Sequence, residues 1–559
     1  MSGRVVLVGA IAAAALVANV AVHATPEPTT VDRTIVGTGE KTLDYGPGDA
    51  RVTRSLQWDD TGGRGRPLAA FKQVSDIHVI DEESPGRVEY FDACGSPFNS
   101  AYRVQEALST QVGNSMLQTL SRFESGPVTG ERLRFVVSTG DNVDNNQFNE
   151  TRWFIDLLDG EEVKPDSGAP GYDGYTREQF SGALTEQDLE RAQQSFTSVG
   201  AQSKWYAVLG NHDGLVQGNV PANDLFNSIA TGGLKAFVPI EGFQDCPGDL
   251  EPATITAIVE RALTTSGRAV PADPDRRFLS KAELIDEHFQ TTGKPEGHGL
   301  ESAPTVEGER QGYYSFRIAP KVRGISLDTV AHTGGGSNGH VPDSQFRWLE
   351  RQLKKNSTRF YEGGEKRRNR KGTDRLIVLF SHHSSASLDN PPGLDDDAPY
   401  HCFKKSDAPN CAAGAGLHGL LRRFPNVVAW INGHEHNNAV RPFAKGKNQK
   451  NKARGFWEIN TASHIDWPQQ TRLLELAWKP GVRAKDTLFV YATVVDHAAP
   501  PELPDPESVP VEDYLAALAR IEAYHDACVR SGQAKCEANG EPEDRNVKLV
   551  MKAPFDLGR

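Results

Sequence analysis

The 559-residue sequence lacks the signatures of several large enzyme classes. No Gly-x-Ser-x-Gly elbow joins a strand directly to a helix, so Ser-His-Asp hydrolysis is not supported. No P-loop is present, and no Gly-x-Gly-x-x-Gly segment opens a helix directly after a predicted strand, as a dinucleotide fingerprint requires. After residue 22, no apolar run is long enough to cross a bilayer. The functional residues must therefore be sought in another kind of site.

Positive charge is also in short supply. The 61 Lys and Arg are outnumbered by 74 Asp and Glu, which gives a formal net charge of -13. This balance argues against general binding of polyanions, and we expect no nucleic-acid-binding surface. The basic runs at 366–371 and 445–454 are interpreted as solvated loops. An anionic substrate would have to be met by local positive charge or by metal ions.

Cysteine is scarce, with six residues and no Cys-x-x-Cys pair, so a cysteine metal site is not supported. Cys402 and Cys411, and likewise Cys528 and Cys536, are close enough in sequence to close small loops. This arrangement leaves Cys94 and Cys246 as a long-range pair, one of fifteen possible connectivities. Disulfides would suit an exported protein.

The first residues are typical of a secretory signal. One Arg at position 4 precedes an apolar stretch from Val5 to Val22, and small residues follow at 22–24. We interpret residues 1–24 as a signal peptide, with an uncleaved membrane anchor as the alternative. The mature chain is expected to be secreted or exposed at the cell surface, without a membrane span.

The composition, with 38% hydrophobic residues, 53 Gly and 34 Pro, is that of a soluble globular protein rich in loops. Residues 25–66 show no sustained periodicity and are predicted to form an N-terminal arm or linker. One α/β domain is predicted over 67–499, with a long insertion at about 214–310 that acts as a cap. Residues 500–559 are predicted to form a C-terminal tail with one helix near 511–529.

Five apolar stretches that are typical of strands are followed directly by polar residues of metal-binding types. The stretches cover residues 68–74, 133–137, 205–209, 376–380 and 427–431. The residues that follow them are Asp76 and His78, Asp141, Asn211, His382, and His434 and His436. Ligand-binding residues of open α/β sheets commonly lie at such strand ends.

These seven side chains offer the oxygen and nitrogen donors that borderline divalent metals prefer, and they are too many for one ion. Two ions are therefore predicted, and Mn, Fe and Zn suit the set equally. Asp141 is the candidate for a carboxylate that bridges both. A water between two such metals ionises near neutral pH, and the hydroxide can attack phosphorus in line.

The ordered motifs resemble those of the calcineurin-like metallophosphoesterases. They read Asp76-Ile-His78, Gly140-Asp141-Asn-Val-Asp144, Gly210-Asn211-His212-Asp213, Ser381-His382-His383 and Gly433-His434-Glu-His436. The resemblance spans about residues 68–498 and is nearest to a group of large exported actinobacterial members. It implies a four-layer α/β/β/α sandwich and hydrolysis of a small phosphomonoester or phosphodiester.

The resemblance also implies a role for each ligand. Asp76, His78 and His436 would hold the first metal together with Asp141. Asn211, His382 and His434 would hold the second, with neighbouring His383 as a possible exchange for His382.

His212 is implied to be the general acid, oriented by Asp144, with Asp213 as the weaker candidate for that role. A carboxylate fixes the tautomer of an imidazole and favours its protonated form, which a general acid needs. The family's protein phosphatases continue with Asp-Arg-Gly, whereas this chain has Asn145 and Asn146 after Asp144, so that activity is doubtful. Purple acid phosphatases carry Tyr at the position of Asp144, so their iron centre is not expected.

Further substrate-binding candidates are His464, Asp466, Arg276 and His298. His464 and Asp466 could instead belong to a hydrogen-bonded turn, and for Arg276 and His298 a solvated surface position is the favoured alternative. The primary hypothesis is an exported dinuclear metal-dependent phosphoesterase. The alternative is a cell-surface binding protein that keeps the metal centre without significant turnover.

Overall fold

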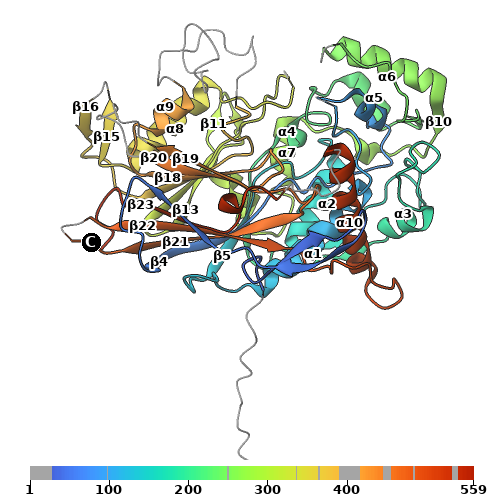
Figure 1. Cartoon of the computed structure of the whole chain (residues 1–559). Coiled ribbons are helices and arrows are strands. Elements are labelled where there is room, and N and C mark those ends of the chain that lie inside the picture. Colours follow the sequence, from blue (N-terminus) through green and yellow to red (C-terminus); the bar gives the residue numbers. More distant parts are fainter. Residues whose placement is uncertain are drawn as a thin grey trace, which may run out of the picture.

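The computed structural model describes residues 28–558 except 97, 249–250, 335, 363–364, 389–415, 445–454, 483–484 and 532–538. Within these ranges the chain forms a mixed α/β body built on one seven-stranded and one six-stranded sheet (Figure 1). The predicted signal peptide at 1–24 lies outside the described residues, as does the basic stretch 445–454.

The larger sheet has the strand order β3-β23-β22-β21-β4-β5-β8. The strands are β3 (Val52–Leu56), β23 (Val547–Lys552), β22 (Thr487–Asp496), β21 (Gln470–Lys479), β4 (Arg66–Val74), β5 (Leu133–Ser138) and β8 (Lys204–Ala207). β4, β5 and β8 are parallel, so their carboxyl ends reach the same edge of the sheet.

The smaller sheet has the order β13-β14-β17-β18-β20-β19. Its strands are β13 (Tyr314–Ala319), β14 (Val322–Ser326), β17 (Leu376–Phe380), β18 (Val427–Asn432), β20 (Gly455–Asn460) and β19 (Ala439–Ala444). β14, β17, β18 and β20 run parallel, which again brings their carboxyl ends to one edge.

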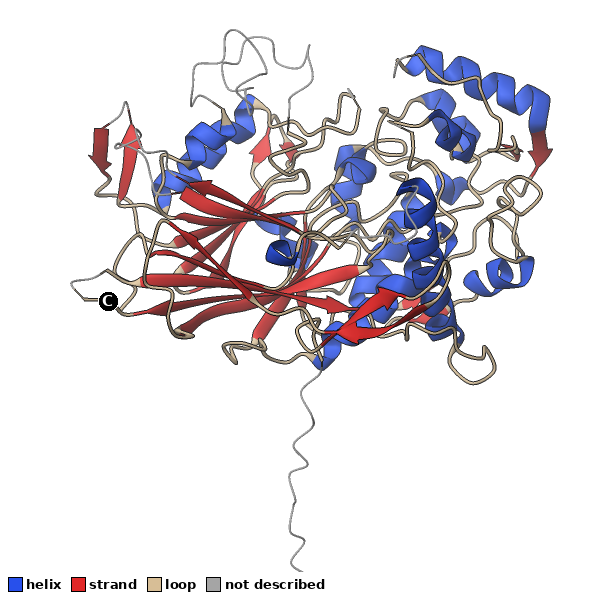
Figure 2. Cartoon of the chain, in the orientation of Figure 1, coloured by secondary structure: helices blue, strands red, loops and turns tan. Residues whose placement is uncertain are grey.

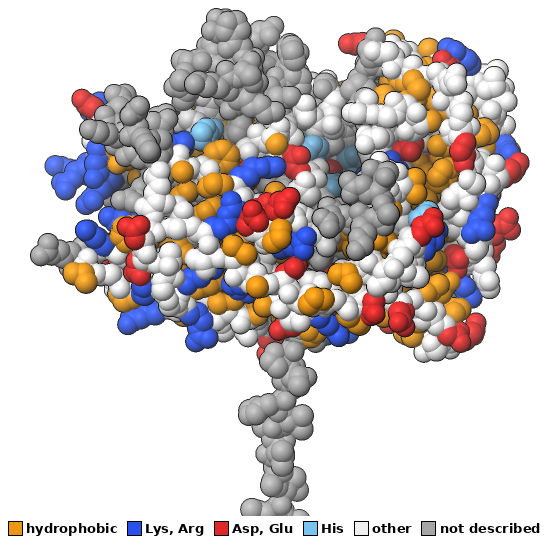
Figure 3. All heavy atoms as spheres, in the orientation of Figure 1, with side chains coloured by type: hydrophobic (Ala, Val, Ile, Leu, Met, Phe, Trp, Pro, Cys, Tyr) orange, Lys and Arg blue, Asp and Glu red, His pale blue; other side chains and the backbone are white. Residues whose placement is uncertain are grey.

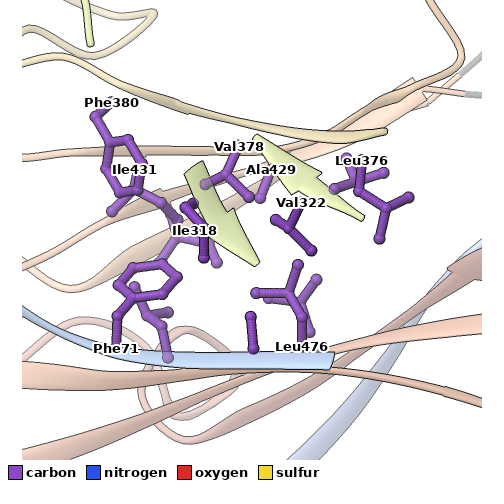
Figure 4. Close-up of a cluster of buried hydrophobic side chains, with 14 of the residues drawn as sticks. Phe71, Ile318, Val322, Leu376, Val378, Phe380, Ala429, Ile431 and Leu476 are labelled. Carbon is purple, nitrogen blue, oxygen red and sulfur yellow. The ribbon is translucent and has the colours of Figure 1, made fainter. Parts of the chain in front are cut away.

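The two sheets bury a shared apolar core between their facing surfaces. Side chains alternate along a strand, so Ala69 and Phe71 of β4 face this core while Ala70 and Val74 point to the opposite side. Figure 4 shows Phe71 and Leu476 from the larger sheet opposite side chains of the smaller one, among them Val378. Complete burial of such a side chain contributes about 1.5–3 kcal/mol to folding.

Helices cover the outer faces of both sheets (Figure 2). α1 (Ser109–Arg122) and α2 (Phe148–Asp159) share a buried cluster with the outer residues of β4 and β5. α8 (Asp343–Lys355) and α9 (Leu417–Leu421) do the same for β17 and β18. Both faces of each sheet are thus buried, which explains why the central strands are almost continuously apolar.

The arm or linker predicted for residues 25–66 is wrong over much of its length. β1 (Arg33–Gly37) and β2 (Leu43–Pro47) form a hairpin that packs on the C-terminal helix, and β3 pairs with β23 in the larger sheet. These strands are short, and buried and exposed residues do not alternate regularly along β1 and β2, so their sequence carries little periodicity.

Helices are the main regular elements of the long insertion, about 214–310, and irregular segments connect them. The insertion contains α5 (Asp224–Ala230), α6 (Pro252–Ser266) and α7 (Lys281–Glu287), with the short pairs β9 (Leu234–Ala236) and β10 (Gly267–Ala269), and β11 (Thr305–Val306) and β12 (Glu309–Arg310). Outside the insertion, the remaining short α-helices and strands are α3 (Glu186–Ala192), α4 (Asn211–Gly214), β6 (Glu162–Val163), β7 (Phe196–Thr197), β15 (Arg359–Glu362) and β16 (Glu365–Arg368).

A disulfide joins Cys94 to Cys246 and ties the insertion to the body, which confirms the predicted long-range pair. Cys528 is also in a disulfide, but Cys402, Cys411 and Cys536 lie outside the described residues, so the two short-range pairs stay predictions.

The segment after residue 499 is more than a helical tail. α10 (Val511–Ser531) matches the predicted helix, but β23 then enters the larger sheet between β22 and β3. Within the described part of the chain, no helix combines the length and apolarity needed to cross a membrane. On the face shown in Figure 3, basic side chains gather around β16, whose four residues are all exposed.

Candidate metal centre and catalytic site

Strands of both sheets deliver the seven predicted ligands. Asp76 and His78 follow β4, Asp141 follows β5, and Asn211 opens α4 just after β8. From the smaller sheet, His382 follows β17, and His434 and His436 follow β18. All seven are buried or half-buried, and they converge where the carboxyl ends of these parallel strands meet.

Five of the seven adopt a left-handed backbone conformation. The φ angles are 51° at Asp76, 48° at His78, 47° at Asp141, 72° at His434 and 51° at His436. A residue other than glycine in this region carries a conformational cost of about 1–3 kcal/mol, and such residues cluster at functional sites. The surrounding structure therefore holds these side chains in place against their local preference.

The ligand atoms lie close together. The side-chain ligand atoms of Asp76, His78, Asp141 and His436 fall within 4.8 Å of one another. His436 Nε2 is 3.3 Å from Asp76 Oδ1, and His78 Nε2 is 3.7 Å from Asp141 Oδ2. The same Asp141 Oδ2 is 3.0 Å from His382 Nε2, so this carboxylate faces candidate ligands from both sheets.

A hydrogen bond at Nδ1 orients three of the four histidines. His78 Nδ1 is 2.9 Å from Asp144 Oδ1, His436 Nδ1 is 2.5 Å from Asp466 Oδ2, and His382 Nδ1 is 2.9 Å from the Thr139 carbonyl. Each acceptor places the proton on Nδ1 and leaves the Nε2 lone pair for a cation, as is usual for metal-binding histidines. Burial, the largest influence, lowers the pKa of His78 to about 4, so its imidazole is neutral at pH 7.

Two buried ligand atoms provide the sharpest test of whether metal ions fit. His78 Nε2 and Asn211 Oδ1 are both buried without a hydrogen-bond partner among the described residues. Asn211 Nδ2 donates to the Gly218 carbonyl at 3.1 Å, which directs the amide oxygen the other way. Buried polar atoms of this kind are rare because they lose hydration without compensation. Divalent cations would satisfy both atoms, so the residues fit the predicted metals.

The geometry also separates His382 from His383. His383 lies within 4.8 Å of His382 and His434, but its Nδ1 is 2.8 Å from Thr329 Oγ1 and its Nε2 is 2.8 Å from the Ser337 carbonyl. Because both ring nitrogens are engaged, His383 has no lone pair to spare. The choice that the sequence left open thus favours His382.

Asp144 reaches His212 by a route different from the predicted one. His212 Nδ1 lies 2.6 Å from the main-chain oxygen of Asp144 and 3.5 Å from its carboxylate. Because the carbonyl can only accept, it fixes the proton on Nδ1 and leaves Nε2 for the substrate. His212 lines a pocket at the predicted metal centre and is 8% exposed.

The carboxylate of Asp144 belongs to a buried charge network. Its Oδ1 accepts from His78 and its Oδ2 from Arg87, which also contacts Glu106 at 2.8 Å. Burial opposes ionisation most strongly, but the Arg87 charge and the His78 hydrogen bond hold the pKa of the Asp144 carboxyl well below its usual range. Asp144, His78 and His212 also lie close enough together to hold a metal ion. The Asp144 carboxylate, however, is already engaged by His78 and Arg87.

Asp213 has a separate task. Its carboxylate accepts from the backbone N–H groups of Gly210, Asn142 and Val143 at 2.6, 3.0 and 3.2 Å. It therefore ties the loop after β8 to the loop after β5, and among the described residues its carboxylate makes no hydrogen bond to the His212 ring.

Two predicted substrate-binding residues are placed elsewhere, which corrects the prediction. Arg276 is fully buried, with Nε 3.2 Å from Asp81 Oδ2. His298 is buried against the Trp205 ring with a 3.5 Å centroid separation. Neither residue lines the pocket at the metal centre. A sequence rule that reads Arg and His in an insertion as anion ligands cannot distinguish these structural roles.

The other two candidates have different positions. His464 is 1% exposed, and its backbone N–H donates to the Asp76 carbonyl, so it supports the loop of a predicted ligand. Asp466 lines the pocket, and its two carboxylate oxygens contact His436 and Arg103. Asp466 therefore belongs to the site and lies next to the predicted metal ligand His436.

The pocket has a volume of about 420 Å³ and is walled by segments that the sequence did not associate with the site. Asn219 is its one lining residue from the insertion, so the predicted cap contributes little among the described residues. Residues 96–103 and α10 supply much of the wall, including Asn99, Arg103, Asp526 and Arg530. No local motif marks these residues, because they reach the pocket only when α10 packs against the loop that contains Asn99.

Comparisons with known proteins give a limited result. No protein-family model matches the chain, and no curated protein matches it. Nine chains of solved structures match, one of them a structure of PhoD, at 12% identity over 88% of this chain and 83% of that one. The TM-score of that match is 0.33, which is too low to carry an argument about activity.

Proposed function

We propose that the protein is a dinuclear metal-dependent phosphoesterase that hydrolyses a small phosphomonoester or phosphodiester. The observation that carries the proposal is the convergence of ligand atoms from five strand ends, with the buried and unpartnered His78 Nε2 and Asn211 Oδ1 among them. The fold proposed with this function is the four-layer α/β/β/α sandwich of the calcineurin-like metallophosphoesterases.

Asp76, His78, His436 and Asp141 would hold one ion, and Asn211, His382, His434 and Asp141 the other. Mn, Fe or Zn would suit these donors. When bound, two divalent cations supply an activated water and stabilise the phosphoryl oxygens. Asp141 faces both groups of histidines, which supports its assignment as the shared ligand.

His212 is proposed to act as the general acid. The Asp144 carbonyl holds Nδ1 as a donor, so the protonated ring presents Nε2–H to the leaving oxygen. A positioned acid of this type accelerates a reaction about 10²–10⁴-fold.

Export is part of the proposal. It is supported by the charged, apolar and small-residue segments within residues 1–24 and by the Cys94–Cys246 disulfide, a bond typical of oxidising compartments.

The test is hydrolysis of p-nitrophenyl phosphate and of its bis ester by the purified chain with added Mn²⁺, Zn²⁺ or Fe²⁺. We expect cleavage of at least one ester, and Asp141→Asn should abolish it. If two metals bind and neither ester is cleaved, the binding-protein alternative replaces the enzyme.

A further inference from the structure

Two arginines line the pocket at the metal centre, and they are used in different ways. Arg530 of α10 donates through Nε to Asp526 at 2.8 Å, and its other nitrogens contact Asp92 at 3.3 Å and the carbonyls of Asn99 and Tyr102. These bonds fasten α10 to the neighbouring loop and occupy most of the guanidinium donors.

Arg103 is less fully engaged. Its Nε lies 2.9 Å from Asp466 Oδ1, and one terminal nitrogen lies 3.3 Å from the Ser100 carbonyl. No other acceptor for this guanidinium occurs in the part of the chain that the structure describes. A guanidinium has five N–H donors, so Arg103 retains donors for a ligand, although the residue is only 4% exposed.

Asp466 connects Arg103 to the metal centre. One carboxylate oxygen accepts from Arg103 and the other lies 2.5 Å from Nδ1 of the predicted ligand His436. Arg103 is therefore held one carboxylate away from a metal ligand, with its charge partly balanced. A second anchor is its backbone N–H, which donates to Glu106 Oε2 at 3.0 Å.

We infer that Arg103 binds non-bridging phosphoryl oxygens of the substrate, and this inference rests on the proposed function. The planar guanidinium matches the spacing of two phosphate oxygens and forms charge-assisted hydrogen bonds with them. The pocket lining contains no lysine among the described residues, so Arg103 is its available non-histidine cation. Asp466 is the positioning residue that fixes the direction of the guanidinium.

The experiment measures binding of inorganic phosphate by calorimetry to the metal-loaded full chain and its variants. We expect Arg103→Gln to raise the phosphate Kd at least tenfold and Arg103→Lys to give an intermediate Kd, because Lys keeps the charge without the planar fork. Metal content, measured by elemental analysis, should stay at two ions per chain. Arg347→Gln is the control, since the Arg347 side chain is 67% exposed on α8 and, among the residues that the structure describes, pairs only with Asp343.

An unchanged phosphate Kd in metal-loaded Arg103→Gln or Arg103→Lys overturns the inference. Loss of metal together with phosphate affinity in both variants also overturns it, because the role would then be structural support of His436. If wild-type protein binds phosphate in an Arg103-dependent manner but cleaves no ester, the proposed catalysis fails while the Arg103 site stands.

Discussion

Asp144 Oδ1 lies 2.9 Å from Nδ1 of His78, while the main-chain oxygen of the same residue lies 2.6 Å from Nδ1 of His212. One residue thereby orients a predicted metal ligand with its side chain and a predicted general acid with its backbone. The two functions respond differently to mutation, because a substitution alters the carboxylate and leaves the carbonyl in place.

Asp144→Asn is expected to weaken metal binding more than proton transfer. The amide cannot match the ionised carboxylate as an acceptor for His78, and losing such an outer partner typically costs about 10–100-fold in metal affinity. Metal titration followed by activity at saturating metal checks this, with most activity recovered at high metal concentration. Unchanged metal affinity would show that His78 needs no help from Asp144.

His212→Gln should leave both metals bound and lower the rate according to the leaving group. For an alkyl phosphate, whose leaving oxygen needs a proton, we expect a loss of about 10²–10⁴-fold. For p-nitrophenyl phosphate the loss should be much smaller, because p-nitrophenolate departs without protonation. Steady-state rates on the two esters give the comparison, and equal losses on both would contradict an acid role.

Removal of metal should destabilise the fold as well as stop catalysis. Burial, the largest influence, and repulsion from Asp141 raise the pKa of Asp76, but His436 and His382 lower it to about 2, so without cations this buried carboxylate relies on the neighbouring histidines. Binding at 100 times Kd contributes about 2.7 kcal/mol per site. Thermal unfolding with and without a chelator measures the effect, and an unchanged Tm would count against tight native metal sites.

Gly218→Ala is expected to reduce activity sharply. Gly218 has φ of 69°, and a Cβ there would collide with the His212 ring and lie 2.5 Å from Asn211 Nδ2. Gly130→Ala is a matched control, because Gly130 has φ of 73° and open space around the added carbon. Both variants carry the left-handed cost of about 1–2 kcal/mol.

Only Gly218→Ala should therefore lose at least tenfold in kcat/KM. Comparing kcat/KM with the free energy of unfolding separates the steric effect on the site from the backbone cost that both variants share. Equal activity of the two variants would refute a steric role for Gly218.

The ion pair between Asp328 and Lys281 should make stability depend on pH in acid. Asp328 is buried and lies 2.7 Å from Lys281 Nζ on α7. Burial, the largest influence, opposes its ionisation, but Lys281 and His332 hold the pKa of Asp328 below its ordinary 3.8. Because the pKa of Asp328 is depressed in the folded state, the unfolded chain takes up the proton first as pH falls. The stabilisation is therefore complete above the unfolded pKa of 3.8 and is lost as pH falls through the folded pKa.

Asp328→Asn should accordingly cost about 1.5–3 kcal/mol at pH 7, and the difference from wild type should shrink below pH ~3.8. Denaturant unfolding across this range measures both quantities. A difference that does not depend on pH would assign the stabilisation to packing.

Much of the fold and the candidate ligand set could be predicted because both depend on local patterns. Apolar runs such as 376–380 are strands on their own evidence, and the residue after each run stands at a strand end wherever the strand lies. The helix predicted near 511–529 is observed as α10, Val511–Ser531, for the same reason. The pairing of Cys94 with Cys246 was predicted as the long-range pair of one of fifteen connectivities, and the structure confirms that pair.

The tertiary structure decided everything that depends on contacts between distant segments. Short polar strands such as β1 and β3 carry too weak a period to be recognised before their partners are known. The roles of Arg276 and His298 depend on buried neighbours far away in sequence.

By itself, the sequence determined which side chains stand at the strand ends and which metal chemistry their donor atoms suit. Only the fold decided how those atoms are oriented: the Asp144 carboxylate orients His78, and a backbone carbonyl orients His212. The fold also decided that Arg103 and α10 line the pocket. The physical reason is that donor type is a property of the residue, whereas the direction of a lone pair is set by the hydrogen-bond partner that folding brings to it.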